Sequence, residues 1–223
     1  MSPRAIAEQS RNKGLDIIAV CDHNSAENAA SVIRACSTRG VHVLPGLEIN
    51  SREEVHTLAI FDSQKQAHAM QEVVYRHLNG TNRPELFGEQ VVANEFDEVE
   101  GFNDRRLIGA TQLGLNDVIN EVHLLGGLSI ASHVDRPSFS IVSQLGFISP
   151  DMELDALEIA GRGNAPLIEN MMPHEKRFPL VTFSDAHVLC DIGRATTMFY
   201  LDRPCVCELL LALRGLSGRK IGK

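Results

Sequence analysis

Histidine and carboxylate side chains in this sequence lie where predicted strands begin or end. In chain order they are His23 after a strand at 15–20, Glu48 after 41–44, His56 near the start of 55–61, His133 after 128–132, and Asp185 with His187 after 179–183. The carboxyl ends of the strands in a parallel barrel meet on one face, where binding sites form. Asp185 and His187 are two residues apart, so they point the same way if the backbone there is extended. The spacing therefore predicts that four histidines and two carboxylates share one site.

Such a set of nitrogen and oxygen ligands favours Zn²⁺, Mn²⁺ or Fe and disfavours Ca²⁺. More than three ligands indicates more than one metal ion. Two ions bridged by hydroxide can generate a nucleophile and hold both the attacking and the leaving oxygen of a phosphoryl displacement. A lone histidine beside a strand is more often a structural residue than a ligand, so the prediction depends on the whole set. The remaining histidines are assigned structural roles: His42, His68, His77, His123 and His174.

Other groups with chemical potential are weaker candidates. Cys205 and Cys207 have the spacing of half a zinc site, but no second cysteine pair follows, so we expect small buried residues. Cys190 follows His187 closely, with no activating arrangement evident from the sequence. The segment 161–164 precedes a predicted helix and is either an anion-binding turn or an ordinary one. The sequence has no phosphate-loop pattern and no Gly-x-Ser-x-Gly nucleophile motif.

The elements that must position these residues alternate between helices and short apolar strands. Helices are predicted at 3–13, 25–38, 64–78, 116–125, 137–146, 164–172 and 204–214, and strands at 15–20, 41–44, 56–61, 128–132, 155–160, 179–183 and 195–201. This alternation indicates βαβ units and a mainly parallel sheet or barrel. Residues 81–110 differ and are interpreted as a hairpin-like insertion rather than a second domain. We therefore predict one domain over residues 1–223.

Composition narrows the function classes. The chain has 223 residues, a net charge of −8 and 43% hydrophobic residues, which excludes a disordered chain. The acidic balance argues against a protein that binds long nucleic acid or a membrane surface, although bound metal ions could supply positive charge for a phosphate substrate. Five irregularly spaced cysteines indicate no disulfide framework, and no apolar run is long enough to span a membrane. We therefore expect a cytoplasmic protein.

Four motifs resemble those of the PHP (polymerase and histidinol phosphatase) family, and they occur in the family's order between residue 1 and about residue 200. The first, residues 14–24, contains Cys21-Asp22-His23 where the family usually has Thr-Asp-His. The other motifs are Gly46-Leu47-Glu48-Ile49 followed by Val55-His56-Thr57-Leu58, then Ala131-Ser132-His133-Val134-Asp135-Arg136, and finally Ser184-Asp185-Ala186-His187. Each motif alone is weak, but four in order are specific.

The resemblance implies a distorted (βα)7 TIM-like barrel that binds up to three divalent metal ions. Members of the family include phosphoesterases, such as histidinol and nucleotide phosphatases, and a domain of bacterial replicative polymerases. By the same resemblance, Glu48 would bridge metal ions with His56 and His133 beside it on one ion. Asp185 would bind another ion, and His23 with His187 a third position. Arg136, placed after the histidine motif, would contact substrate phosphate.

One departure from the family pattern concerns the start of the chain. The family opens with a strand that carries an Asp-x-His-x-His motif, and residues 1–6 resemble the stretch that follows it. The first strand and two metal ligands are therefore expected to be missing, with the chain about 20 residues short by family comparison. Fewer than three metal ions are then expected. A barrel without one strand has two exposed edges, which favours homo-oligomers.

The leading hypothesis is a metal-dependent phosphoesterase that hydrolyses a small phosphorylated metabolite or nucleotide through a metal-bound hydroxide. Carboxylates such as Asp22 or Asp135 could orient the ligating imidazoles. One alternative is a degenerate PHP-like binding module without catalysis, which the missing ligands would explain. Another is a nuclease acting on short nucleic acids, which would need a basic groove that the sequence does not reveal. No membrane partner is expected.

Overall fold

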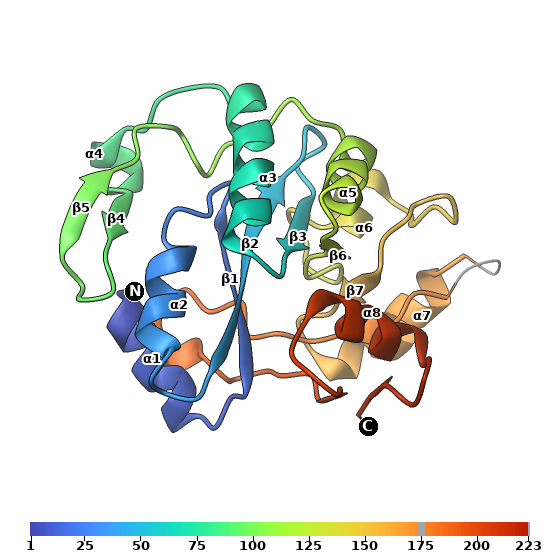
Figure 1. The fold of residues 1–223 in the computed structure, drawn as a ribbon. Helices are drawn as coiled ribbons and strands as arrows, with labels where there is room; N and C mark the ends of the chain where they lie inside the picture. The colour runs from blue at the N-terminus through green and yellow to red at the C-terminus, as the bar shows by residue number, and fades with distance from the viewer. Residues whose placement is uncertain (174–176, 223) are drawn as a thin grey trace.

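The structure is a computed structural model that describes residues 1–173 and 177–222 (Figure 1). His174, one of the histidines assigned a structural role, lies outside the described residues. The helices are α1 (Pro3–Asn12), α2 (Ala29–Cys36), α3 (Gln64–His77), α4 (Pro84–Phe87), α5 (Leu115–Leu124), α6 (Ile141–Leu145), α7 (Ala165–Met171) and α8 (Val206–Arg214). Within the described ranges, no helix combines the length and the apolar character that a membrane crossing requires.

Six strands form the main sheet, in the order β1-β2-β3-β6-β7-β8. Their bounds are β1 Ile17–His23, β2 His42–Asn50, β3 His56–Ile60, β6 Leu128–Ala131, β7 Ala156–Glu158 and β8 Leu180–Val181. The mixed α/β class is confirmed, and parallel pairing joins β1 to β2, β6 to β7 and β7 to β8. A closed seven-stranded barrel is not present in the described residues, because β1 and β8 end the sheet as unpaired edges.

Strand β3 departs from the parallel pattern and runs antiparallel to both β2 and β6. Only residues 51–55 connect β2 to β3, whereas a parallel connection needs a crossover of about a dozen residues or more. Strand β2 is also longer than predicted, since it continues through Pro45 and Gly46 to Asn50. Glu48 therefore lies inside a strand rather than after one.

The helices cover the two faces of the sheet in separate groups. Helices α1 and α2 pack with the start of β2 in one cluster that includes Ala7, Val32 and Val43. Helices α3 and α5 cover the outer face of β2 and β3, where Leu47 and Phe61 are fully buried. A further cluster lies on the inner face, where Leu44, Ile60, Leu128 and Ile130 pack against Leu209 and Leu213 of α8. Alternate residues of β2 thus face different clusters, and Glu48 shares the inner face with Leu44.

Two local predictions of the sequence are corrected by the structure. The predicted helix at 25–38 begins only at Ala29, because the chain first forms a turn in which the amide of Ala26 donates to Gln71 Oε1 at 2.8 Å. The predicted strand at 195–201 is reduced to β9 (Phe199–Tyr200), which pairs with β10 (Lys220–Ile221) in a small separate sheet. This segment therefore adds no strand to the main sheet.

Within residues 81–110, β4 (Val91–Ala93) and β5 (Val99–Phe102) pair as an antiparallel hairpin that stands beside α1 and α2 (Figure 1). The side chain of Asn28 fastens it, since it donates to the carbonyl of Val91 and accepts from the amide of Ala93. An ion pair of 2.8 Å between Arg34 and Glu95 adds a second contact. The hairpin is held against the first helices instead of extending the main sheet.

Candidate metal centre

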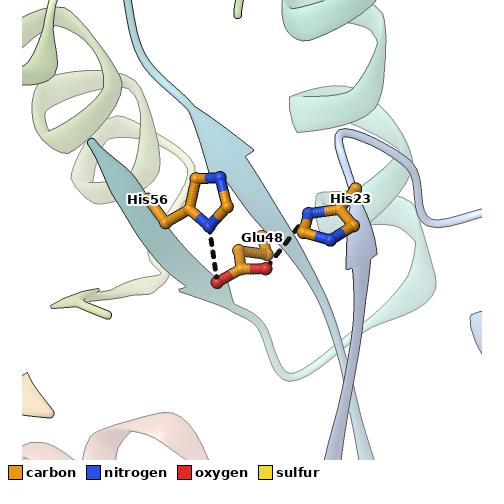
Figure 2. Close-up of side chains that lie close together, drawn as sticks. All are labelled: His23, Glu48 and His56. Carbon is orange, nitrogen blue, oxygen red and sulfur yellow. Dashed lines mark ion pairs between the residues drawn. The ribbon is translucent and has the colours of Figure 1, made fainter. Parts of the chain in front are cut away.

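The carboxylate of Glu48 is the centre of a group of histidines at one end of the sheet (Figure 2). His23 Nδ1 lies 3.1 Å from Glu48 Oε2, and His56 Nδ1 lies 3.3 Å from Oε1. His133 Nε2 approaches the same Oε1 at 3.5 Å. Ligand atoms of His23, Glu48 and His56 lie within 4.8 Å of one another, a spacing that a single metal ion can bridge. We call these four residues the Glu48 cluster.

Strand register explains why these side chains meet. His23 ends β1 and pairs directly with Glu48 of β2. His56 begins β3, and it lies at the same end of the sheet as His23 and Glu48 because β3 is antiparallel to β2. Two residues before Glu48, a Cβ added to Gly46 would lie 2.6 Å from the Ala59 carbonyl oxygen, so only glycine lets the strands approach this closely here.

Glu48, His56 and His133 are buried, whereas the side chain of His23 is 33% exposed, and the charges of the cluster shift one another's pKa values. Burial alone would raise the pKa of Glu48, but contacts with His133, His56 and His23 outweigh it and hold that pKa well below its ordinary value. The pKa of His23 is lowered, first by burial and then by the neighbouring His56 and His187, against the opposing pull of Glu48. An ionised carboxylate beside an imidazole that loses its proton easily is the state that divalent metal ions bind.

Two ring nitrogens of the cluster have no hydrogen-bond partner. His56 Nδ1 is close to Glu48, but its angle is unsuitable for a hydrogen bond, and His133 Nδ1 is also buried without a partner. Phe139 stacks on the His56 ring at 4.7 Å and excludes water from one side of it. Buried polar atoms without partners are costly unless a ligand satisfies them. These residues therefore fit a bound divalent ion, and the mixed His and Glu donors suit Zn²⁺, Mn²⁺ or Fe.

Asp185, Arg136 and His187 form a second group beside the Glu48 cluster, called the Asp185 group below. Arg136 Nη1 lies 2.6 Å from Asp185 Oδ2, and His187 Nδ1 lies 3.7 Å from Oδ1. The ring of His187 is 6.0 Å from that of His23, which joins the two groups. The extended backbone predicted for this segment is wrong, because Asp185 has a φ of 43° and its carbonyl contacts His187 Nδ1. The two side chains nevertheless lie on the same side of the site.

The backbone around both groups contains unusual conformations. Among the described residues other than glycine, positive φ values occur at Asn24, His133, Phe139 and Asp185, all of which adjoin the site, and at only three positions elsewhere. Such conformations cost about 1–3 kcal/mol each when the residue is not glycine, and they persist only where the surroundings impose them. Tertiary contacts around the site therefore impose these loop conformations.

Sequence reasoning missed Glu158, which ends β7 and is 3% exposed. Its Oε2 accepts a hydrogen bond of 3.2 Å from the backbone amide of His133. Burial raises the pKa of Glu158 to about 7, assisted by the charges of Asp185 and Glu48 and opposed by His133. A glutamate inside the apolar strand sequence Ala156-Leu157-Glu158-Ile159 was the available signal, because carboxylates are rarely buried without a role.

Asn24 was also missed, although it follows His23 directly. Its amide donates to the Glu48 carbonyl at 2.8 Å, and its Oδ1 accepts from the amide of Asn50. Its Nδ2 donates to the carbonyls of Leu107 and Gly109 at 2.7 and 2.8 Å. Asn24 thus ties β1, β2 and the end of the 81–110 insertion together at the edge of the site.

A cavity of about 920 Å³ opens beside the edge strand β1. His23, Glu48, Glu158, Asp185 and His187 contribute to its lining. The other lining residues include apolar side chains of the inner sheet face, such as Leu44 and Ile130, and polar residues, such as Thr197 and Arg203. The opposite wall is the segment 183–201, which takes no part in the main sheet. Both groups therefore border one space that a small ligand could enter.

The remaining candidates lie away from this space or act differently than expected. Asp135 accepts hydrogen bonds from the Ala160 amide and the Asn164 side chain, so it holds the 160–164 turn instead of an imidazole. Cys205 is half-buried and Cys207 is exposed, so the expectation of two buried cysteines is wrong. His123, on α5, bonds Asp155 at 2.9 Å in a structural contact.

Comparison with known proteins supports the resemblance. The model of a family described as PHP-associated matches residues 174–215. A curated protein of Bacillus subtilis, YqxK, is 30% identical over 115 residues, which are 49% of this chain and 29% of that protein. This chain therefore spans less than a third of that relative's length.

Solved structures extend the similarity over nearly the whole chain. The lesion-specific endonuclease PfuEndoQ from Pyrococcus furiosus superposes with a TM-score of 0.68 over 99% of this chain and 53% of its own, at 20% identity. A protein of Bifidobacterium adolescentis described as a metal-dependent phosphoesterase gives a TM-score of 0.54 over 94% of this chain and 88% of its own, at 18% identity. The resemblance to the PHP family that the motifs carry is therefore confirmed.

Proposed function

We propose that this chain, which shares its fold with these two structures, is a metal-dependent hydrolase of phosphoric esters. Its preferred substrate is a small phosphorylated metabolite or nucleotide. The observation that carries the proposal is the Glu48 cluster, in which three histidines surround one buried, ionised carboxylate. The structural relatives described as a metal-dependent phosphoesterase and an endonuclease support the same class of reaction.

In this proposal, the residues of the site bind one or two metal ions. His23, Glu48, His56 and His133 hold a divalent ion, with Asp185 and His187 available to a second one. Such an ion, when bound, supplies a Lewis acid for a phosphate oxygen and lowers the pKa of water. Zn²⁺, Mn²⁺ and Fe all suit these donors.

Arg136 binds substrate phosphate in this proposal. Its guanidinium is held by the carboxylate of Asp185, which lines the shared cavity, and it has further N–H groups that can donate to phosphate oxygens. In the metal-free chain, Glu158 holds a proton more readily than an ordinary glutamate, because burial raises its pKa to about 7. Its hydrogen bond to the His133 amide fixes it behind the cluster.

The test is hydrolysis of a phosphomonoester and a phosphodiester, p-nitrophenyl phosphate and its bis ester, by the full chain with Mn²⁺ or Zn²⁺. We expect metal-dependent hydrolysis that the variant Glu48→Gln loses. Glu100→Gln, which changes an exposed glutamate of β5, is the matched control and should retain activity. Protein that binds metal but hydrolyses neither ester would contradict the proposal and favour a non-catalytic binding module.

A second candidate is a nuclease, favoured by the likeness to PfuEndoQ over 99% of this chain. The net charge of −8 repels the phosphates of nucleic acid, which argues against long nucleic acid as the main substrate. Incubation with a short oligonucleotide that carries one abasic site distinguishes the candidates. Cleavage at the lesion with turnover above that of the small esters would favour the nuclease.

Two features of the chain bear on its cellular compartment and its oligomeric state. Five cysteines without a disulfide are typical of the reducing cytoplasm, which is the compartment we propose. The unpaired edges of β1 and β8 favour a homo-oligomer, because an exposed strand edge can pair with another copy. Analytical ultracentrifugation tests the second point, and a stable monomer at micromolar concentration would contradict it.

A further inference from the structure

We infer that Cys205 and Cys207 form a reversible thiol–disulfide couple at the start of α8. Their sulfur atoms lie 3.0 Å apart, with Cys205 half-buried and Cys207 exposed. A disulfide requires the sulfurs to approach to about 2.05 Å, so the two sulfur atoms must move closer by about 1 Å. This inference is independent of the proposed hydrolase function.

The surroundings give the two thiols different roles. The hydrogen bond from Cys205 and the guanidinium of Arg203, whose Nη2 lies 3.9 Å from Cys207 Sγ, lower the pKa of Cys207. Burial raises the pKa of Cys205, and the contact with Cys207 adds to this effect. Cys207 is thus the thiolate that reacts first, and Cys205 is the thiol that follows.

The alternative use of such a pair is half a metal site. Zn²⁺ in structural sites takes four ligands. In the part of the chain that the structure describes, the group with metal-binding spacing includes neither cysteine. The pair is therefore better suited to redox chemistry than to structural zinc.

The chemistry requires an external disulfide, RSSR, as the oxidant. The Cys207 thiolate attacks one sulfur of RSSR, forms a mixed disulfide and releases RS⁻. Cys205 then loses its proton and attacks Cys207 Sγ, which releases the second RS⁻. The net change is oxidation of two protein thiols to one disulfide and reduction of RSSR to two RSH molecules.

The couple lies at the opposite end of the sheet from the Glu48 cluster. The amide of Val206, between the two cysteines, donates to Asp62 Oδ1 at 2.7 Å. Asp62 follows the end of β3, whereas His56 begins that strand. Oxidation therefore changes the first turn of α8 without moving the metal centre directly.

The experiment treats the reduced full chain with glutathione disulfide and follows it by intact mass and peptide mapping. We expect the loss of two hydrogen atoms, with a bridge between Cys205 and Cys207 that dithiothreitol reverses. Cys205→Ser should retain glutathione on Cys207, because the second thiol is gone. Alkylation by iodoacetamide should be at least about threefold faster at Cys207 than at the exposed Cys190.

Cys190→Ser is the matched control and should form the bridge as the wild type does. Three results would overturn the inference: glutathione that stays on Cys207 in the wild type, a bridge that involves another cysteine, or equal alkylation rates at Cys207 and Cys190. Stoichiometric Zn²⁺ retained by Glu48→Gln and lost by Cys207→Ser would also overturn it, in favour of a metal site.

Discussion

The Glu48 cluster and the Asp185 group border one cavity but are built in different ways. Three of its four residues, His23, Glu48 and His56, lie within β1, β2 and β3, which have seven, nine and five residues in continuous register, and His133 follows β6. Asp185 and His187 follow β8, which has two residues, in a loop where Asp185 has a positive φ, and Arg136 lies in the loop between β6 and α6. The side chain of Glu48 is 7% exposed, while that of His187 is 65% exposed.

The Glu48 cluster is therefore the preorganised half of the site, and the Asp185 group is the adaptable half. The long strands hold His23, Glu48 and His56 before any ligand arrives, and the rings of His56 and His133 already lie 5.5 Å apart. In the Asp185 group, the Arg136 guanidinium already neutralises the Asp185 carboxylate. A ligand there must compete with an existing ion pair, so we expect the first half to dominate metal affinity and the second half to respond to substrate.

Removing the charge of Glu48 should have the largest effect, which is a loss of metal affinity in the Glu48 cluster. We expect Glu48→Gln to weaken binding of Mn²⁺ or Zn²⁺ by more than about 100-fold, because a buried anionic ligand is lost. His187→Gln, in the exposed half, should weaken it by no more than about tenfold. Isothermal titration calorimetry measures both, and equal losses would abolish the distinction between the halves.

Glu158 interacts with both the Glu48 cluster and Asp185, and it should make the free energy of unfolding depend on pH. Its folded pKa of about 7 exceeds its ordinary value of 4.5, so the folded chain keeps a proton that the unfolded chain releases in this window. The free energy of unfolding should therefore fall as pH rises from about 4.5 to 7, by roughly 2–4 kcal/mol from this group.

Glu158→Gln removes this contribution. Urea denaturation of the metal-free protein at pH 5 and pH 8 should give the variant a smaller loss of stability with rising pH than the wild type. The same slope in both proteins would show that Glu158 is not protonated in the folded chain at pH 5–7.

Arg136→Met should weaken the adaptable half. We expect kcat/KM for a phosphate ester to fall about tenfold, corresponding to about 1.4 kcal/mol, with metal affinity little changed. Arg194→Met removes an exposed arginine whose ion pair with Asp191 is 3.3 Å long, and it should have no effect on turnover. A large loss of metal affinity in Arg136→Met would mean that the arginine organises the metal centre itself.

The smallest expected effect concerns the support beneath the short strands. His123 on α5 bonds Asp155, which precedes β7 and also accepts from the Ser129 amide of β6. The contact with Asp155 raises the pKa of His123, so its stabilisation is complete below pH 6.5 and is lost as pH rises through the raised folded pKa. His123→Gln should cost about 1 kcal/mol at pH 5.5 and less at pH 9, as measured by denaturation. An equal cost at both pH values would contradict this.

The sequence predicted the residues of the site better than the geometry that unites them. Apolar runs that stop at polar residues pointed to His23, Glu48, His133 and Asp185. The structure brings these residues close together, although Glu48 lies inside β2 rather than after a strand. His56 begins its strand, and it reaches the other site residues only because β3 is antiparallel to β2. The antiparallel direction depends on the short connection between the two strands rather than on local propensity.

Other features could not be predicted because they depend on tertiary contacts. Barrel closure requires partners for β1 and β8, and no local pattern reveals whether they exist. Asn24 acts through hydrogen bonds to residues more than 80 positions away, which leave no periodicity in the sequence. The positive φ of Asp185 likewise comes from its surroundings, because an isolated aspartate favours no such conformation strongly.

The central claim is that the Glu48 cluster binds a divalent metal ion. Equilibrium dialysis of the full chain against Mn²⁺ or Zn²⁺, followed by elemental analysis, tests it directly. We expect at least one ion per chain in the wild type and in Glu100→Gln, and at least one ion fewer in Glu48→Gln. Wild-type protein without bound ion, or Glu48→Gln with the same content as the wild type, would contradict it.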